Sequence, residues 1–359
     1  MRRWHTIPVL VASLALVCAC TLLAGCGEAM YDTSTSGSTA NEETLEERVA
    51  SGLSIQATRG SGTLDLKRPS LTGSRPKDIE PNTWTVFVYL CGSDLESNGG
   101  AATADLGEMV GASGSSDVRF VVETGGAKQW RSNVDGKKLS RYVIQDGSIT
   151  EVDSVKAADM GEANTLSDFL TWGLKNYPAE HMGAILWNHG GGSISGVCFD
   201  ERNNYDSLLL RELDLALAQT ALTMWQKYDF IGFDACLMST METANVLASY
   251  ADYMIGSEEV EPGTGWEYSS IMEYLAQHPS CDGGELGRAL CDSYLESLPS
   301  RSSATATLAV IDLAQVDDLM QGFYPARTRR RSPSCRATSA GPRPTAPTTV
   351  WRVTRTWWT

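Results

Sequence analysis

The chain has 359 residues, 42% of them apolar, and a formal net charge of −15. This length suffices for one large domain or for a domain with additions. The acidic surplus disfavours nucleic acid as a partner, because phosphate groups carry the same sign of charge. It favours basic substrates only weakly, since long-range attraction of cationic peptides and ordinary solubility explain it equally well.

The amino terminus predicts export. Two arginines precede an apolar stretch over residues 7–23, which is the pattern of a signal peptide and is too short for a permanent membrane span. Leu-Ala-Gly-Cys at 23–26 matches the bacterial lipobox, in which Cys26 becomes the lipid-modified amino terminus. We therefore expect residues 1–26 to be a lipoprotein signal peptide and the protein to be anchored to the cell membrane, facing outside the cytoplasm. An ordinary signal peptide with an unrelated cysteine is the alternative.

Residues 27–80 predict a flexible tether behind the lipobox. They are rich in Ser, Thr, Gly and Glu and poor in aromatic and branched side chains. Such a segment buries too little apolar area to offset the entropy lost on ordering. It would hold a folded domain away from the membrane.

The globular part alternates between strand and helix patterns. Helical patterns fall between most of the apolar runs, including a helix that starts with Thr165 as its cap and apolar stripes over 208–220 and 238–250. Residues 125–160 are typical of an inserted hairpin, which we expect beside the active-site face. The alternation predicts an α/β fold with a mostly parallel sheet and helices on both faces. Strands are expected at residues 84–90, 118–123, 183–188, 229–233, 253–257 and 305–311.

Two of these strands end on chemically capable side chains. The run at 185–188 leads to His189 and three glycines, and the run at 231–235 leads to Cys236. In an α/β sheet, ligands and chemistry collect outside the carboxyl ends of the strands. A thiolate beside an imidazole is a strong nucleophile at a carbonyl, and glycines let backbone N–H groups approach a developing oxyanion. The pattern therefore predicts a cysteine nucleophile with a histidine base.

Simpler interpretations of these residues stay open. A cysteine after an apolar strand is commonly a small buried hydrophobe. Asp234, two residues before Cys236, has the side chain to cap the helix expected from residue 238. The other histidines of the globular part, His181 and His278, are expected in surface loops.

No required cofactor is predicted. The glycine run lacks the motifs of a nucleotide site. The cysteines at 91, 198, 236, 281 and 291 lack the close spacing of a zinc site or of an exported redox pair, so no metal ligand is assigned. Calcium stays open in so acidic a chain, although no EF-hand loop is present. Disulfide pairing among these cysteines also stays open.

Six motifs together resemble one known family. In chain order they are Trp-Thr-Val-Phe-Val-Tyr-Leu at 84–90, Gly-Ser-Asp-Leu-Glu at 92–96, Asn-His-Gly-Gly-Gly at 188–192, Asp-Ala-Cys-Leu-Met at 234–238, Gly-Ser-Glu-Glu at 256–259 and Pro-Gly-Thr-Gly-Trp at 262–266. From about residue 84 to about residue 323 the chain is similar to the clostripain family of cysteine peptidases. The resemblance implies a caspase-like three-layer α/β sandwich and cleavage after arginine or lysine. Some relatives use calcium.

The resemblance also implies roles by position. His189 would be the base and Cys236 the nucleophile, and the backbone N–H groups of Gly190 and Cys236 would form the oxyanion hole. An acidic pocket would hold the basic side chain before the scissile bond, because a carboxylate pairs with a guanidinium through charge-assisted hydrogen bonds. The candidates for this pocket are Asp234, Glu258 and Glu259, with Glu261 in the same cluster, and which glutamate points inward is left open.

Self-cleavage is a further expectation from the resemblance, since relatives often cut themselves between the histidine and cysteine motifs. That interval contains Arg202, Arg211 and Lys227. Arg202 lies in a polar stretch that we expect to be an exposed loop, whereas Arg211 lies in a helical pattern. Arg202 is therefore the predicted self-cleavage site.

The chain changes character after residue 324. Residues 325–359 contain no Asp, Glu or Lys and many Arg, Pro, Ser, Thr and Trp. We expect a reading-frame shift near codon 324, which would truncate a peptidase domain at 81–324 and make the tail an out-of-frame translation. A genuine basic extension that binds anionic envelope polymers is the alternative.

The sequence thus predicts a membrane-tethered cysteine endopeptidase that acts as a monomer on peptides or proteins with Arg or Lys, through a thioester acyl-enzyme. A catalytically inactive surface lipoprotein that binds basic peptides or glycans is the competing hypothesis. A redox lipoprotein is a third, which the cysteine spacing disfavours.

Overall fold

The computed structural model describes residues 52–58, 63–298, 305–328 and 351–352. All of them belong to one unit of the chain, Arg48–Thr359. The predicted signal peptide with Cys26 and most of the predicted tail lie outside the described residues. Within the described part, no helix combines the length and the apolar character needed to cross a membrane.

The apolar runs of the sequence form a central sheet. Among the described residues it has nine strands, in the order β13-β12-β11-β10-β7-β3-β4-β5-β6. The inner strands from β11 to β4 run parallel, and the strands at both edges pair antiparallel. The strands are β3 Trp84–Cys91, β4 Val118–Gly125, β5 Lys138–Gln145, β6 Ser148–Lys156, β7 His181–Trp187, β10 Tyr228–Asp234, β11 Ala251–Gly256, β12 Ala309–Asp312 and β13 Trp351–Arg352.

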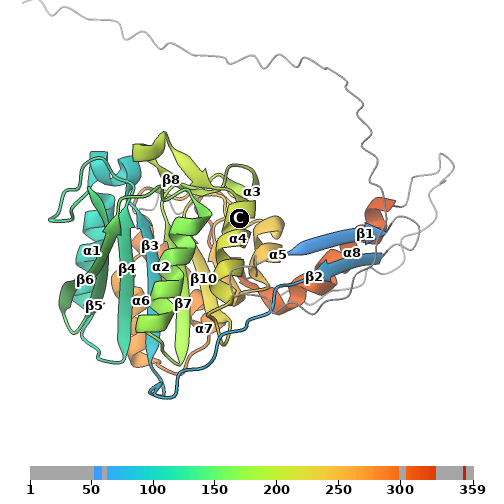
Figure 1. Cartoon of the computed structure of the whole chain (residues 1–359), viewed down its shortest axis with the longest axis horizontal. Helices are drawn as coiled ribbons and strands as arrows, with labels where there is room; N and C mark the ends of the chain where they lie inside the picture. Colours follow the sequence, from blue (N-terminus) through green and yellow to red (C-terminus); the bar gives the residue numbers. More distant parts are fainter. Residues whose placement is uncertain (1–51, 59–62, 299–304, 329–350, 353–359) are drawn as a thin grey trace, which may run out of the picture. The chain divides into compact units, whose positions relative to one another are not determined.

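Helices cover both faces of this sheet. In Figure 1, α2 and α4 lie in front of the strands and α6 and α7 behind them. One apolar cluster joins α2, α4 and α5 to one face, and a second joins α1, α6 and α7 to the other. The helices are α1 Ala101–Ala112, α2 Ala163–Asn176, α3 Gly192–Ser195, α4 Leu210–Ala221, α5 Met241–Leu247, α6 Tyr268–Gln277, α7 Gly283–Ser297 and α8 Val316–Thr328. The predicted three-layer α/β arrangement is confirmed.

β3 shows how the sequence produces these two clusters. Successive side chains of a strand point to opposite faces. Phe87 and Tyr89 enter the cluster with α2 and α4, whereas Val86, Val88 and Leu90 enter the cluster with α1 and α6. This strand, apolar at every position but Thr85, is therefore buried on both sides, as expected for an inner parallel strand.

The predicted hairpin is present but lies elsewhere on the sheet. β5 and β6 are joined by Asp146 and Gly147, which both have positive φ, the geometry of a tight hairpin turn. β5 pairs antiparallel with the open edge of β4. The hairpin therefore extends the sheet on the side of β4, three strands from β7, and does not flank the strand that leads to His189.

α2 starts earlier, and α5 later, than the sequence indicates. α2 begins at Ala163, with Glu162 in the extended conformation before it, so Thr165 is a helical residue and not the cap. α5 begins at Met241 and not near residue 238, and the hydroxyl of Thr240 caps it by accepting from the N–H of Thr243.

Part of the predicted tether is held against the domain. β1 Ser54–Thr58 and β2 Thr63–Lys67 form an antiparallel hairpin that packs against α8. Behind it, the guanidinium of Arg68 donates to the backbone and side-chain oxygens of Asn245 and pairs with Asp317. These polar anchors supply the stabilisation that the apolar content of the segment does not indicate, so the expected tether is shorter than 27–80.

The remaining short elements follow strand ends, and η3 follows the end of β12 that pairs near the start of β11. β8 and β9 pair antiparallel with each other. These short elements are η1 Leu95–Gly99, β8 Val197–Asp200, η2 Glu201–Asn203, β9 Asp206–Leu208 and η3 Leu313–Gln315.

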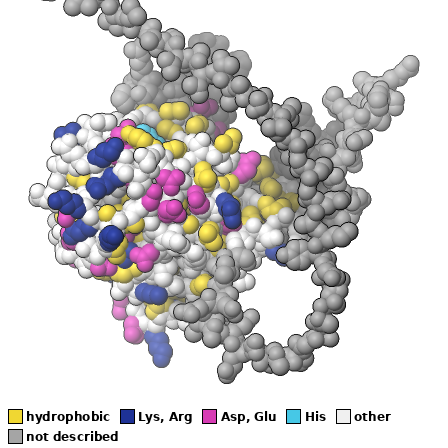
Figure 2. Space-filling model, turned by 45° about the horizontal axis from the view of Figure 1, so that its top comes forward, with side chains coloured by type: hydrophobic (Ala, Val, Ile, Leu, Met, Phe, Trp, Pro, Cys, Tyr) yellow, Lys and Arg dark blue, Asp and Glu magenta, His cyan; other side chains and the backbone are white. Residues whose placement is uncertain are grey.

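Charges of both signs occur on the surface. On the face shown in Figure 2, basic side chains gather towards the left of the described surface and acidic ones towards its middle. The net charge of −15 is therefore not a uniform acidic field on this face.

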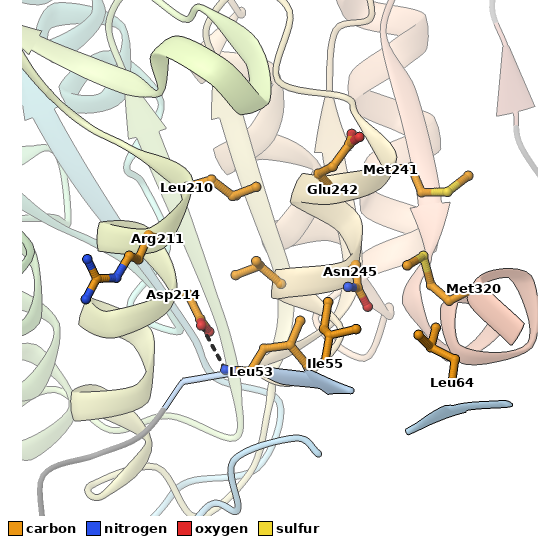
Figure 3. Close-up of a pocket in the computed structure, with 11 residues that line it drawn as sticks. Leu53, Ile55, Leu64, Leu210, Arg211, Asp214, Met241, Glu242, Asn245 and Met320 are labelled. Atoms are coloured by element: carbon orange, nitrogen blue, oxygen red, sulfur yellow. Dashed lines mark hydrogen bonds between the residues drawn. The ribbon is translucent and has the colours of Figure 1, made fainter. Parts of the chain in front are cut away.

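An apolar pocket of about 670 Å³ lies between β1, β2, α4, α5 and α8. Figure 3 shows leucine, isoleucine and methionine side chains from these elements around it, with the N–H of Leu53 bonded to the carboxylate of Asp214. The apolar lining consists of Leu53, Ile55, Leu64, Leu210, Met241, Val246 and Met320.

Candidate active site

The carboxyl edge of the sheet brings together the two residues that the sequence singled out. In the register between β7 and β10, Trp187 pairs with Asp234. His189 and Cys236 each lie two residues beyond that pair, so they leave adjacent parallel strands at the same level. Both line one pocket of about 240 Å³.

The glycine after His189 packs directly on the cysteine turn. A Cβ atom at Gly190 would lie 2.0 Å from the carbonyl oxygen of Cys236, a separation that no real contact tolerates. The next residue of the turn, Leu237, has a φ of 65°, a backbone angle that residues other than glycine seldom adopt. Within the described residues, the N–H groups of Gly190 and Cys236 have no hydrogen-bond acceptor. Both are therefore available to a ligand oxygen.

Hydrogen bonds hold both reactive side chains. Cys236 Sγ accepts from the N–H of Glu261 at 3.3 Å. His189 Nε2 lies 2.9 Å from Oδ1 of Asp94, and 40% of the histidine side chain is exposed. The imidazole is therefore both anchored and accessible.

Asp94 reaches the histidine because β3 and β7 are neighbours. Leu90 of β3 pairs with Trp187 of β7, and Asp94 and His189 follow these residues by four and two positions. Burial would raise the pKa of the Asp94 carboxyl, but its hydrogen bond and charge interaction with His189 outweigh burial and hold that pKa below its ordinary value. Sequence analysis included Asp94 in a motif without giving it a role. The sequence signal that could have identified Asp94 is its position just after β3, the neighbour of the strand that leads to His189.

Asp234 and Glu261 line the pocket next to the cysteine. The carboxylate of Asp234 accepts from the N–H of Trp266 at 3.3 Å and from the hydroxyl of Tyr268 at 3.1 Å. Burial raises the pKa of Asp234 to about 6. Burial and the charge of Asp234 raise the pKa of Glu261. Because Thr240 caps α5, Asp234 does not cap that helix, and its side chain faces the pocket instead.

A third carboxyl group, which sequence analysis missed, comes from α1. Asp105 also lines the pocket, and its Oδ2 accepts from Nε1 of Trp187 at 2.7 Å. Burial, together with the charge of Asp234, raises the pKa of Asp105 to about 9. α1 precedes the reactive motifs by some 80 residues in the chain, and only the packing of α1 on the sheet shows that Asp105 belongs to the site.

Two of the predicted pocket residues lie elsewhere. Glu258 and Glu259 are exposed and are not among the residues that line the pocket. The hydroxyl of Thr307 accepts both of their N–H groups, so this part of the loop is held by its backbone while the side chains face solvent. The acidic lining therefore consists of Asp105, Asp234 and Glu261.

The remaining predicted residues are found in the following places. Arg202 is exposed in η2 and its guanidinium donates to the carbonyl of Gly136. His278 is exposed after α6. His181, predicted in a loop, is the first residue of β7 and its Nδ1 lies 2.8 Å from Asp229.

Cofactor and disulfide chemistry gain no support from the described part of the chain. Its five cysteines are free thiols. No three His, Cys, Asp or Glu side chains there are arranged to hold a metal ion. Calcium dependence stays a prediction for experiment.

A cysteine and a histidine on adjacent strand ends, over available backbone N–H groups, are the groups that a cysteine hydrolase on an α/β sheet requires. A sequence model of the clostripain family, peptidase family C11, matches residues 88–324. The chain belongs to this family of cysteine peptidases.

Individual relatives agree with this membership. Clostripain of Hathewaya histolytica is 30% identical over 136 residues, which are 33% of this chain and 25% of that protein. The match thus spans about a quarter of the curated relative. The X-ray structure of a secreted C11 cysteine protease from Bacteroides thetaiotaomicron, iotapain, has a TM-score of 0.53 and 22% identity over 67% of this chain and 69% of that one. A second structure of a secreted C11 protease from that organism, in complex with an irreversible peptide inhibitor, has a TM-score of 0.52 and 22% identity over 66% of this chain and 68% of that one.

Proposed function

We propose that the protein is a cysteine endopeptidase that cleaves peptide bonds after arginine or lysine, with Cys236 as nucleophile and His189 as base. The register of β7 and β10 carries the proposal, because it sets both side chains on one pocket. Membership of the clostripain family supports the peptidase chemistry.

The reaction would pass through an acyl-enzyme. His189 takes the proton of the Cys236 thiol. The sulfur then adds to the carbonyl carbon, and the N–H groups of Gly190 and Cys236 bind the resulting oxyanion. His189 gives a proton to the leaving amine, which departs and leaves a thioester. His189 then takes a proton from water, hydroxide attacks the thioester, and the carboxylic product leaves as the thiol is restored.

The pocket lining supports a basic residue before the scissile bond. Asp105, Asp234 and Glu261 face one space of about 240 Å³, and no Lys or Arg among the described residues lines it. Burial raises the pKa of all three carboxyls, and the charge of Asp234 raises the pKa of Asp105 and Glu261 further. A guanidinium or ammonium group would offset that repulsion through charge-assisted hydrogen bonds.

The cellular setting belongs to the same proposal. The protein would be exported, lipid-anchored on Cys26, monomeric and free of any required cofactor. Arg202 would be the self-cleavage site, since it is exposed in a short turn. Cleavage there requires release of its contact with Gly136. The tail at 325–359 would be an out-of-frame translation, which resequencing the locus tests.

The decisive experiment is hydrolysis of fluorogenic peptides ending in Arg, Lys, Asp or Leu by the full chain. We expect cleavage after Arg or Lys that Cys236→Ala and His189→Ala both abolish. His278→Ala, at an exposed histidine, is the matched control and should cleave like the parent. The parent should also lose its full-length band on a gel, whereas Cys236→Ala and Arg202→Gln should keep it.

Absence of cleavage by a folded sample would overturn the peptidase proposal. In that case binding of a labelled basic peptide, unaffected by thiol alkylation, would favour the inactive binding lipoprotein. Cleavage after Asp or Leu with none after Arg or Lys would overturn the specificity alone.

A further inference from the structure

We propose that Asp94 is a positioning residue for His189, so that the catalytic pair works as an Asp–His–Cys arrangement. This inference rests on the proposed function. It assigns a role in the site to a residue of the β3–α1 loop, whose side chain approaches His189 from the side of β3.

The contact fixes one nitrogen of the imidazole. Asp94 Oδ1 lies 2.9 Å from His189 Nε2, and a carboxylate accepts hydrogen bonds but does not donate them. The neutral imidazole therefore carries its proton on Nε2 and its lone pair on Nδ1. Nδ1 is then the atom that exchanges protons with Cys236 and with the leaving amine.

The loop that carries Asp94 is held in place by buried groups. Ser93, fully buried, lies in the left-handed region with φ of 49°. The buried carboxylate of Glu96 accepts from the N–H of Thr103 at 2.9 Å and from the N–H of Arg131 at 2.6 Å. A side chain on a loop fixed in this way orients its partner at little entropic cost.

A second bond ties the two strand ends together. The side-chain amide of Asn188 donates to the carbonyl of Cys91 at 2.7 Å, and its oxygen accepts from the N–H of Phe199 at 2.8 Å. The residue before His189 is thereby fixed to the residue that ends β3. Asp94 and His189 therefore keep their separation without depending on their own partly exposed side chains.

Other titratable groups also face this pair. Among the described residues they come from the pocket and from the segment that runs from η2 to β9, and the cation Lys128 lies 3.9 Å from Glu201 of that segment. Asp94 is thus a carboxylate in direct contact with His189, and the others act from farther away. They are Cys236, Asp234, Glu261 and Asp105 in the pocket, and Tyr205, which lies near both Asp94 and Glu201.

The molecule supplies its own control, because it has a second histidine–aspartate pair. His181 Nδ1 lies 2.8 Å from Asp229 Oδ1, at the opposite end of β7 from the reactive edge. The chain has four histidines, so each can be followed by NMR of a histidine-labelled sample. Asp229→Asn removes an equivalent contact from a histidine that takes no part in the proposed chemistry.

The test compares Asp94→Asn, Asp94→Glu and Asp229→Asn with the parent chain. For Asp94→Asn we expect kcat to fall on the order of tenfold or more, KM to change little, and the titration of His189 to move to lower pH because the imidazolium loses its anion. Asp94→Glu should recover part of kcat. Asp229→Asn should move the titration of His181 and leave kcat unchanged.

The pH dependence of Cys236 alkylation gives a readout that needs no substrate. It should change in Asp94→Asn and not in Asp229→Asn. Parental kcat in Asp94→Asn would overturn the inference, and so would a lower kcat with both the His189 titration and the alkylation profile unchanged. If the parent cleaves no peptide, the proposed peptidase function fails on its own, whereas the titration and alkylation still decide whether Asp94 controls His189.

Discussion

The two pockets described above differ in how they are built. The apolar one, about 670 Å³, is enclosed by helices and by the β1–β2 hairpin. The other, about 240 Å³, lies at strand ends and contains the histidine, the cysteine and three carboxyls. The larger pocket is formed by helices that pack around a hairpin. The polar side chains of the smaller pocket are brought together because parallel strands end at the same edge of the sheet. In this molecule, the volume of a pocket is therefore a poor guide to the proposed active site.

The same comparison separates two kinds of stabilisation. The apolar pocket brings together side chains that gain from leaving water. The reactive pocket instead holds three buried carboxyl groups whose pKa values are raised, which is a cost to the folded protein in the absence of a cation. Substitutions around the apolar pocket should therefore lower mainly stability, whereas substitutions in the pocket with the three carboxyls should lower mainly activity.

The largest effect on activity is expected from Gly190→Ala. The added Cβ would meet the Cys236 carbonyl at 2.0 Å, so the backbone must shift where the oxyanion would bind. A displacement of this size costs on the order of 100-fold in kcat. Gly107→Ala in α1, where a Cβ meets nothing within 4 Å, is the control and should keep parental kcat. Equal rates for both variants would contradict the packing argument.

The next effect is the loss of kcat/KM that we expect from Asp234→Asn. Loss of this carboxylate should lower kcat/KM for Arg and Lys peptides by roughly 100-fold, because a charge-assisted pair is lost in a dry pocket. The same change should raise the melting temperature, since it relieves repulsion with Glu261. Glu259→Gln, at an exposed position, should alter neither. Undiminished cleavage by Asp234→Asn would place the basic side chain elsewhere.

The apolar region should respond to Arg68→Ala with a loss of stability alone. Arg68 joins the hairpin segment to Asn245, Ser249 and Asp317, and we expect a loss of about 1–3 kcal/mol in unfolding free energy. Denaturant titration measures this, with exposed Arg75→Ala as control. A fall in kcat under native conditions would show that the two regions are coupled.

The smallest effect concerns pH. Burial raises the pKa of Asp234 to about 6 and that of Asp105 to about 9. The folded state therefore holds these protons more tightly than the unfolded state, and stability falls as pH rises from about 4 through these raised values. Asp105→Asn should flatten the fall in melting temperature between pH 6 and 9, by a few degrees at most. The exposed Asp117→Asn should not, and parallel curves for all three proteins would contradict the assignment.

More of the fold than of the pocket could be predicted from the sequence. Apolar runs such as that of β3 are long and bounded by turn residues, so all six expected strands are present. Helix starts were less certain, because Thr165 and the residue that caps α2, Glu162, lie within one turn of each other. The β1–β2 hairpin was missed because polar contacts such as those of Arg68 hold it, and these have no periodic pattern.

The sequence by itself determined the α/β class and the two strand-end motifs with His189 and Cys236, because local periodicity and short motifs are properties of neighbouring residues. Only the tertiary structure decided which carboxyls meet them. Asp94 and Asp105 reach the site from the β3–α1 region, Glu261 turns inward, and Glu258 and Glu259 face solvent. Side-chain direction in a loop and contact across strands depend on packing between segments far apart in the chain, and no local pattern encodes that packing.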